Sequence, residues 1–414
     1  MTTAPPGPDR RWLSLIGVGE DGIEGLSPAA RRLVAQAEFV FGGARHLALV
    51  DGLGSGARLA WPSPLSDAVP AILERRGRAV CVLASGDPFF YGVGSLLTPH
   101  VDIDEIVCLP APSAFSLAAA RLGWALQECA LLSLHGRAFE RITPHLQPGA
   151  RILALSWDGT TPRRVANFLT AQGLGRSQLI VLEAMGGARE RLRQSPAAGF
   201  ALDDIDALNT IALEVIADRD ARVLPLSCGL PDALFENDGQ ITKREIRAIS
   251  LSALAPRRGE LLWDVGAGSG SVAIEWMLRH SANRAIAIEA RSDRAARIQR
   301  NALALGTPDL AIVEGEAPAA FAGLPTPDAI FVGGGASHAD LLDAAWAVLA
   351  AGGRLVVNAV TLEAQAEIMR RYGRFGGDLA SLQIARADPI GSFHGWRPAL
   401  PVVQWSITKQ EPTR

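Results

Sequence analysis

The stretch Gly259-Glu-Leu-Leu-Trp-Asp264-Val-Gly266-Ala-Gly268-Ser-Gly270 carries the clearest fold signal in this 414-residue chain. A short apolar strand ends at the acid Asp264, and three glycines at alternate positions lead directly into an amphipathic helix that begins at Ser271. Glycine lets the backbone approach a ligand because no Cβ stands in the way. The stretch therefore predicts a ligand-binding loop between a strand and a helix.

The spacing of these glycines differs from that of a nicotinamide dinucleotide site. That fingerprint requires a third Gly or Ala three residues after the second glycine, and Ser271 occupies this position here. A second acid, Glu289, ends the next expected strand 19 residues after Gly270, where a carboxylate can accept both ribose hydroxyls. The pattern resembles motif I of the class I S-adenosylmethionine methyltransferases. This resemblance implies that the cofactor is bound by Gly266, Ala267, Gly268, Ser269, Gly270 and Glu289.

The composition indicates a globular chain of two domains. A length of 414 residues suits two domains of roughly 200 residues each, and the chain is 48% hydrophobic and 20% charged. The formal net charge of −3 gives no global field toward nucleic acid or an anionic membrane. Because no apolar run approaches 18 residues and no apolar signal segment opens the chain, we expect a cytoplasmic protein. Four separated cysteines and seven scattered histidines predict no metal site.

Strands and helices alternate from Arg11 onward, which predicts parallel or mixed sheets covered by helices. In the first half we expect strands at 12–16, 38–41, 79–84, 105–109, 131–134, 151–155, 178–183 and 209–216, and helices from Ser27 and near 65, 90, 113, 161 and 187. In the second half the expected strands are 259–265, 284–289, 310–314, 328–332, 353–358, 380–387 and 400–407, the last two forming an antiparallel edge. The turn-rich segment 218–228 predicts a linker between domains at 11–217 and 229–414. Thr242 and Glu245 predict a capping box for the helix that follows.

Three loops of the first half each follow an expected strand. The first, Gly17-Val-Gly19-Glu-Asp-Gly22, fits the dinucleotide pattern formally, but its helix starts only at Ser27 and the next strand ends without an acid for a ribose. The second is Ser85-Gly86-Asp87-Pro88-Phe-Phe-Tyr91-Gly92, and the third is Leu109-Pro-Ala-Pro-Ser113-Ala114. A dinucleotide site is therefore not expected here.

Together the three loops resemble the tetrapyrrole methylases, which have a Gly-x-Gly loop, a Gly-Asp-Pro loop and a Pro-Gly-x-Ser-Ser segment in this order. The resemblance implies a two-lobed α/β fold that binds S-adenosylmethionine between its lobes. It implies a cofactor site made by Gly17, Gly19, Gly86, Asp87, Tyr91, Ser113, Ala114 and Met185. The chain has Ala111 and Ala114 where the family has glycine and serine, which leaves the backbone role open. The plain alternatives are an Asx-type turn at Asp87 and a core position for Tyr91.

The segment 229–248 resembles the entry segment of the precorrin carbon-15 methyltransferases that also decarboxylate. The agreement continues at 314–318, 331–335 and 352–363. The resemblance implies that Thr242 lies against the cofactor, that Glu316 and Ala317 flank adenine, and that Asn358 lines the substrate cleft. We take Thr242 and Asn358 as the candidate catalytic residues. The plain alternatives are a helix-dipole contact for Glu316 and a turn for Asn358.

A tetrapyrrole methylase placed ahead of such a domain resembles the bifunctional methyltransferases of cobalamin biosynthesis. The resemblance implies two S-adenosyl-L-methionine sites per chain and a reduced tetrapyrrole, precorrin-6B, as the methyl acceptor. It implies methylation of carbon 5 by the first half, and methylation of carbon 15 with loss of the ring C acetate carboxyl by the second, to give precorrin-8X. A homodimer or homotetramer is also implied. We expect arginines such as Arg244 and Arg247 to rim the second cleft and hold carboxylates of the acceptor.

Three alternatives stay open at this stage. The acceptor could already carry cobalt. The class I half could methylate another acceptor, such as RNA, beside a degenerate first half, although the neutral charge balance counts against nucleic acid. The chain could also be a non-catalytic cofactor-binding or scaffold protein. The number of S-adenosylmethionine sites per chain would separate two active halves from one.

Overall fold

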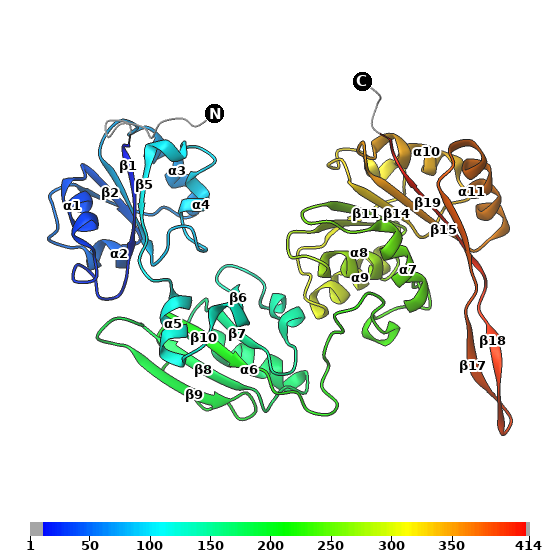
Figure 1. The fold of residues 1–414 in the computed structure, drawn as a ribbon, viewed down its shortest axis with the longest axis horizontal. Coiled ribbons are helices and arrows are strands. Elements are labelled where there is room, and N and C mark those ends of the chain that lie inside the picture. Colours follow the sequence, from blue (N-terminus) through cyan, green and yellow to red (C-terminus); the bar gives the residue numbers. More distant parts are fainter. Residues whose placement is uncertain (1–10, 411–414) are drawn as a thin grey trace. The chain divides into compact units, whose positions relative to one another are not determined.

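The computed structural model describes residues 11–410. The chain forms two compact units, one of residues up to 139 together with 145–223, and one of residues 140–144 together with 224–414 (Figure 1). The main boundary between the two units lies between residues 223 and 224, inside the segment 218–228. No helix among the described residues is both long and apolar enough to cross a membrane.

The first lobe of the first unit is a parallel sheet of five strands in the order β3-β2-β4-β1-β5. The strands are β1 (Leu13–Val18), β2 (Phe39–Gly42), β3 (Ala57–Ala60), β4 (Val80–Ser85) and β5 (Ile106–Leu109). The helices are α1 (Pro28–Gln36), α2 (Ala44–Leu49), α3 (Ala68–Leu73) and α4 (Gly94–Leu97). The predicted start of α1 is confirmed, because the Ala30 N–H donates to the Ser27 hydroxyl at 3.2 Å.

The second lobe of this unit is a mixed sheet in the order β6-β7-β10-β8-β9. Its strands are β6 (Cys129–Ser133), β7 (Arg151–Leu155), β8 (Gln178–Glu183), β9 (Arg191–Pro196) and β10 (Asn209–Glu214), and its helices are α5 (Ala114–Leu122) and α6 (Thr161–Ala171). The helix expected near 187 is wrong. The alternate residues Arg191 and Arg193 both bind the buried Glu183, which places them on one face of the edge strand β9. Two sheets confirm the two-lobed fold.

The second unit contains a seven-stranded sheet in the order β13-β12-β11-β14-β15-β19-β16. The strands are β11 (Leu261–Val265), β12 (Arg284–Glu289), β13 (Ala311–Glu314), β14 (Ala329–Val332), β15 (Arg354–Ala359), β16 (Asp378–Leu382) and β19 (Val402–Thr408). The helices are α7 (Arg244–Leu254), α8 (Ser271–Leu278), α9 (Ser292–Ala304), α10 (Ala339–Val348) and α11 (Leu362–Phe375). Because β19 pairs antiparallel with β15 and β16, the expected antiparallel edge is confirmed.

Two apolar cores cover the two faces of this sheet. One contains Trp263 and Trp405 with residues of α10 and α11, and the other contains Trp276 with residues of α7, α8 and α9. Trp263 and Trp276 are 1% and 0% exposed. Both tryptophans are therefore core residues.

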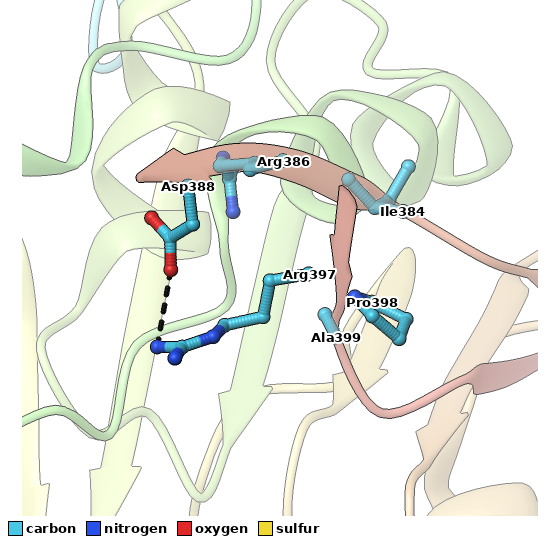
Figure 2. A pocket seen from close by; sticks show the side chains of 6 residues that line it. All are labelled: Ile384, Arg386, Asp388, Arg397, Pro398 and Ala399. Carbon is cyan, nitrogen blue, oxygen red and sulfur yellow. Dashed lines mark ion pairs between the residues drawn. The ribbon is translucent and has the colours of Figure 1, made fainter. Parts of the chain in front are cut away.

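The single strand expected at 380–387 is wrong. β16 ends at Leu382, and a separate antiparallel hairpin follows, made of β17 (Ala385–Ile390) and β18 (Phe393–Pro398). Figure 1 shows this hairpin extending away from the sheet of its unit. A hollow of about 210 Å³ lies at its base, where Asp388 pairs with Arg397 at 3.1 Å. Figure 2 shows the side chains that line this hollow. None of the predicted site residues lines this hollow.

Candidate functional site

The three loops of the first unit meet at the carboxyl ends of β1, β4 and β5. The Gly86 N–H donates to the Val18 carbonyl at 3.2 Å, and the Ala111 N–H donates to the Gly86 carbonyl at 3.1 Å. A Cβ on Gly17 would lie 1.9 Å from the Gly86 oxygen, so only glycine fits at this position. The carboxyl ends of parallel strands are where open α/β sheets bind ligands.

The side chains of Asp87 and Ser113 are both used within their own loops. One Asp87 carboxylate oxygen accepts the Phe89 N–H at 2.8 Å, which is the Asx-type turn. The Ser113 hydroxyl accepts the Ser116 N–H at 3.1 Å and caps α5, which begins at Ala114. These loops therefore present mainly backbone groups to a ligand.

A pocket of about 350 Å³ lies beside the first loop, within the size range of small-molecule sites. It is lined by Glu20, Arg45, Ala48, Leu49, Gly187, Ala188 and Arg189. Glu20 follows Gly19 directly, and Met185, which is 8% exposed, precedes the other end of the pocket by two residues. Glu20 forms ion pairs with Arg45 and with Arg189. The predicted residues Gly19 and Met185 are thus near this pocket in the sequence, but neither of them lines it.

The glycine loop of the second unit connects β11 to α8. Gly266, Gly268 and Gly270 have φ angles of 69°, 59° and 74°, in the left-handed region where glycine is favoured. The Gly268 N–H donates to the Glu289 carboxylate at 2.8 Å. A Cβ on Gly270 would lie 2.7 Å from the Ile298 side chain. The loop is therefore held closely between the end of β12 and helix α9.

Two acidic residues lie beside this loop, near the carboxyl ends of the neighbouring strands β11 and β12. Glu289 is 5% exposed and also accepts the Arg291 N–H at 3.1 Å. Asp264 is buried, and one of its oxygens accepts the Ala273 N–H at 3.0 Å. Burial raises the pKa of Asp264 to about 7, and the negative charge of Glu289 adds to this increase.

The loop has features that fit a polar ligand. The buried Ser269 hydroxyl has no hydrogen-bond partner among the described residues, so a ligand could supply one. The Gly315 N–H donates to the Glu289 carbonyl at 3.0 Å, which brings the turn of Glu316 and Ala317 beside this strand end. Glu316 is exposed and Ala317 half-buried. Gln240 lies over Gly268, since its carbonyl would be 3.0 Å from a Cβ there, and Thr242 follows two residues later.

Asn358 lies within β15, so the turn alternative is wrong. Its amide nitrogen donates to the Ser250 hydroxyl and its amide oxygen accepts from Gln404, both at 2.9 Å. Gln404 also donates to Ser250 at 2.9 Å. The three side chains are between 0% and 8% exposed. Both ends of the Asn358 amide are therefore already bonded within the protein.

The expectation that Arg247 rims a cleft is wrong. Arg247 is 0% exposed, and its Nε donates to Glu275 at 2.5 Å while Nη1 lies 3.1 Å from Asp232. The predicted capping box is wrong as well, because α7 begins at Arg244 with Lys243 as its N-cap, and the Thr242 carbonyl instead accepts from Arg247. One signal could have revealed this ion pair: Glu275 is a lone charge in an otherwise apolar helical segment, 271–278. Arg244 is exposed.

Comparison with known proteins gives matches in both halves. The family model described as Tetrapyrrole (Corrin/Porphyrin) Methylases matches residues 13–201, and the one described as Precorrin methyltransferase domain matches residues 233–409. The chain is 56% identical over 96% of both chains to a Precorrin-6Y C(5,15)-methyltransferase [decarboxylating] of Sinorhizobium sp..

Two shorter relatives match parts of the chain. A Cobalt-precorrin-7 C(5)-methyltransferase of Salmonella typhimurium is 32% identical over 46% of this chain and 94% of its own length. A Probable cobalt-precorrin-6B C(15)-methyltransferase (decarboxylating) of Saccharolobus solfataricus is 36% identical over 33% of this chain and 71% of its own length.

Proposed function

The chain belongs to the family of precorrin-6Y C(5,15)-methyltransferases that also decarboxylate, and from this premise we propose how its two halves divide the reaction. It is an S-adenosylmethionine-dependent methyltransferase and decarboxylase of cobalamin biosynthesis. We assign methylation of carbon 5 to the first unit, and methylation of carbon 15 with loss of carbon dioxide to the second. Separate relatives named for each of these activities support the division.

The observation that carries this proposal is that one chain contains glycine-lined loops on two unlike sheets. In the first unit we place S-adenosylmethionine at the three loops that meet around Gly17 and Gly86, with Gly19, Asp87, Tyr91, Ser113, Ala114 and Met185 around it. In the second unit we place a second molecule on the loop 266–270, with Glu289 on its ribose and with Glu316 and Ala317 beside its adenine. The unpartnered Ser269 hydroxyl and the close approach at Gly268 fit this second site. Thr242 lies on the chain segment that continues from Gln240 over this loop.

When bound, S-adenosylmethionine supplies a sulfonium methyl group, whose C–S bond breaks as the new C–C bond forms and the acceptor carbon gives up a proton. The protein's part is to hold the acceptor carbon in line and to exclude water, which is worth up to about 7–11 kcal/mol in ideal cases. Glycine at positions 17 and 270 lets these loops pack closely on their neighbours, because a Cβ there would lie 1.9 Å from the Gly86 oxygen and 2.7 Å from the Ile298 side chain. Asn358 acts through the Ser250 and Gln404 contacts that fix the end of β15.

Loss of the acetate carboxyl needs no group on the protein to receive electrons. The C–C bond to the carboxylate breaks, its electron pair enters the conjugated macrocycle, and a proton returns to the former methylene carbon to give a methyl group. The protein favours this step by leaving that one carboxylate without a cationic partner, since such a partner would stabilise the ground state. We expect Arg244, which is exposed at the start of α7, to hold another carboxylate of the acceptor.

We propose a metal-free precorrin as the acceptor. The full-length relative at 56% identity is named for a precorrin without cobalt, whereas the two cobalt-precorrin relatives match only part of the chain at 32% and 36%. Parallel assays with precorrin-6B and its cobalt complex would separate the two acceptors. Faster turnover of the cobalt complex would overturn this choice.

The number of cofactor sites tests the proposal directly. Titration of the whole chain with S-adenosylhomocysteine should find two sites per chain. Glu289→Gln should remove or weaken one site by roughly tenfold or more, because the carboxylate that accepts the ribose hydroxyls is lost. The matched control is Glu314→Gln, since Glu314 pairs in register with Glu289 on β13 and is exposed. A single site in the unmodified chain would refute two active halves.

We also propose that the chain forms a homodimer or homotetramer. The hairpin β17–β18 exposes Ile390, Phe393 and Trp396 over 66%, 76% and 77% of their surfaces. A two-stranded hairpin is marginally stable alone, and large exposed apolar side chains mark association surfaces. A second copy of this hairpin is the partner that would cover these side chains.

A further inference from the structure

Exposed aromatic and basic side chains gather beside the Gly86 loop of the first unit. We call this group the aromatic shelf, and it consists of Phe90, Tyr91, His135, Arg137 and Trp157. Phe90, Tyr91 and Trp157 are exposed over 36%, 43% and 53% of their surfaces. Aromatic side chains of this size supply a large contact area, so several of them in contact at a surface indicate a binding role.

Ring contacts connect the members of the shelf. The Phe90 and Tyr91 rings are stacked with centroids 5.4 Å apart. The Arg137 guanidinium lies 5.3 Å from the centroid of the Tyr91 ring, and the His135 and Trp157 rings are 5.8 Å apart. His135 and Arg137 are two residues apart in the turn after β6, which brings these two groups of contacts close together in the chain.

Both lobes of the first unit hold the shelf in place. The Tyr91 hydroxyl donates to the Leu131 carbonyl of β6 at 3.2 Å, which ties the β4 loop to the second sheet. The Phe90 ring packs on Phe115 at 4.9 Å, and Phe115 is 1% exposed in the helix that Ser113 caps. Tyr91 has a φ of 54°, a conformation that is rare for a bulky residue. Such strained backbone conformations cluster at ligand-binding and active sites.

The shelf also stands at the end of the sheets where ligands bind. Tyr91 follows the Gly86 loop at the carboxyl end of β4, and Trp157 follows the carboxyl end of β7, which is parallel to β6. Within residues 11–410 no carboxylate pairs with Arg137. A guanidinium can stack on an aromatic ring and still bind a carboxylate through its edge.

From these observations, and resting on the proposed function, we propose that the aromatic shelf binds the precorrin acceptor in the first unit. The flat conjugated macrocycle lies on the aromatic rings, and Arg137 pairs with one of its acetate or propionate carboxylates. Tyr91 lies where donor and acceptor meet, because it follows the Gly86 loop by only a few residues.

The test uses the full chain with precorrin-6B and S-adenosylmethionine, and mass spectrometry counts methyl groups and carbon dioxide loss. In Arg137→Gln and in Trp157→Ala, the KM for methylation of carbon 5 should rise about tenfold. Methylation of carbon 15 and decarboxylation should keep their normal rates, so a decarboxylated product with one new methyl group accumulates. Binding of S-adenosylhomocysteine should be unchanged in both variants.

The matched control is Arg78→Gln, which removes another exposed guanidinium that lies 4.8 Å from an aromatic centroid, that of Phe39, in the same unit. This variant should methylate carbon 5 normally. Wild-type KM for carbon 5 in both shelf variants would overturn the shelf proposal while the unmodified chain still adds two methyl groups. If the unmodified chain adds no methyl group at carbon 5, the proposed function fails instead.

Discussion

Asp264 is the residue whose chemistry departs furthest from its ordinary behaviour in the second site. Its carboxyl is buried, and its pKa of about 7 compares with 3.8 for the free side chain. Between these pH values the folded chain keeps a proton that the unfolded chain releases. The contribution of this carboxyl to stability is therefore fully present below pH 3.8 and is lost as the pH rises through about 7.

The substitution Asp264→Asn tests this titration. Asparagine keeps an oxygen for the Ala273 N–H but cannot ionise, so the variant should gain stability relative to the wild type as the pH rises from 5 to 8. Urea unfolding midpoints at the two pH values measure the difference. A gap between the two proteins that is the same at pH 5 and pH 8 would contradict a protonated Asp264 in the folded state.

At the scale of single residues, sequence reasoning succeeds where the residues that contact each other are close in sequence. The loop 266–270 between β11 and α8 is predicted by the local pattern, and its assignment to the cofactor stays a prediction. Arg247 could not be placed in this way, because its buried partner Glu275 is 28 positions away. The Asn358 network could not be predicted for the same reason, since Gln404 and Ser250 are 154 positions apart.

At the scale of elements, the central strands are predictable because they are buried runs of apolar residues. The elements that sequence reasoning missed are helix α2, the edge strands β3 and β9 and the hairpin β17–β18. Edge strands carry charged residues and lack a continuous apolar run, so their pattern differs little from that of a loop. β9 is stabilised by its Glu183 contacts and not by an apolar face.

The end of α7 offers a test of helix termination. Ala255 has a φ of 46°, and Arg354 donates to the carbonyls of Leu254 and Ala255 at 2.9 and 3.2 Å. Because glycine adopts this conformation without steric cost, Ala255→Gly should raise the free energy of unfolding by roughly 0.5–1 kcal/mol. Ala253→Gly, inside the same helix, should lower it by about 1 kcal/mol. Urea unfolding that finds both variants destabilised would contradict strain at Ala255.

The hairpin β17–β18 provides the second test at this scale. The double variant Phe393→Ser, Trp396→Ser should lower the molecular mass in solution, because it removes the apolar side chains through which we expect copies to associate. Light scattering coupled to gel filtration measures the mass. Leu226→Ser is the control, since Leu226 is equally exposed at 75% but lies outside the hairpin. An unchanged oligomer in the double variant would show that copies associate elsewhere, or not at all if the wild type is a monomer.

At the scale of the whole molecule, the order of two unlike α/β folds along the chain is the feature that sequence reasoning predicted best. Each fold occupies its own continuous part of the sequence apart from residues 140–144, so its motifs can be recognised in that part alone. We propose one reaction for each half, and the two family models match separate ranges, 13–201 and 233–409. A physical separation of the halves can therefore test it.

Cutting the chain between residues 223 and 224 should divide the activities. We expect the piece 224–414 to release carbon dioxide from precorrin-6B and to add one methyl group, because it keeps the 266–270 loop, Glu289 and the Asn358 network intact. The piece 1–223 should add one methyl group and release no carbon dioxide, since it contains only the three loops around Gly17 and Gly86. Mass spectrometry of each product, and of the product made by the mixed pieces, measures both. Carbon dioxide from the first piece alone would contradict the division, whereas a mixture that restores two methyl groups would show that each half retains its own donor site after separation.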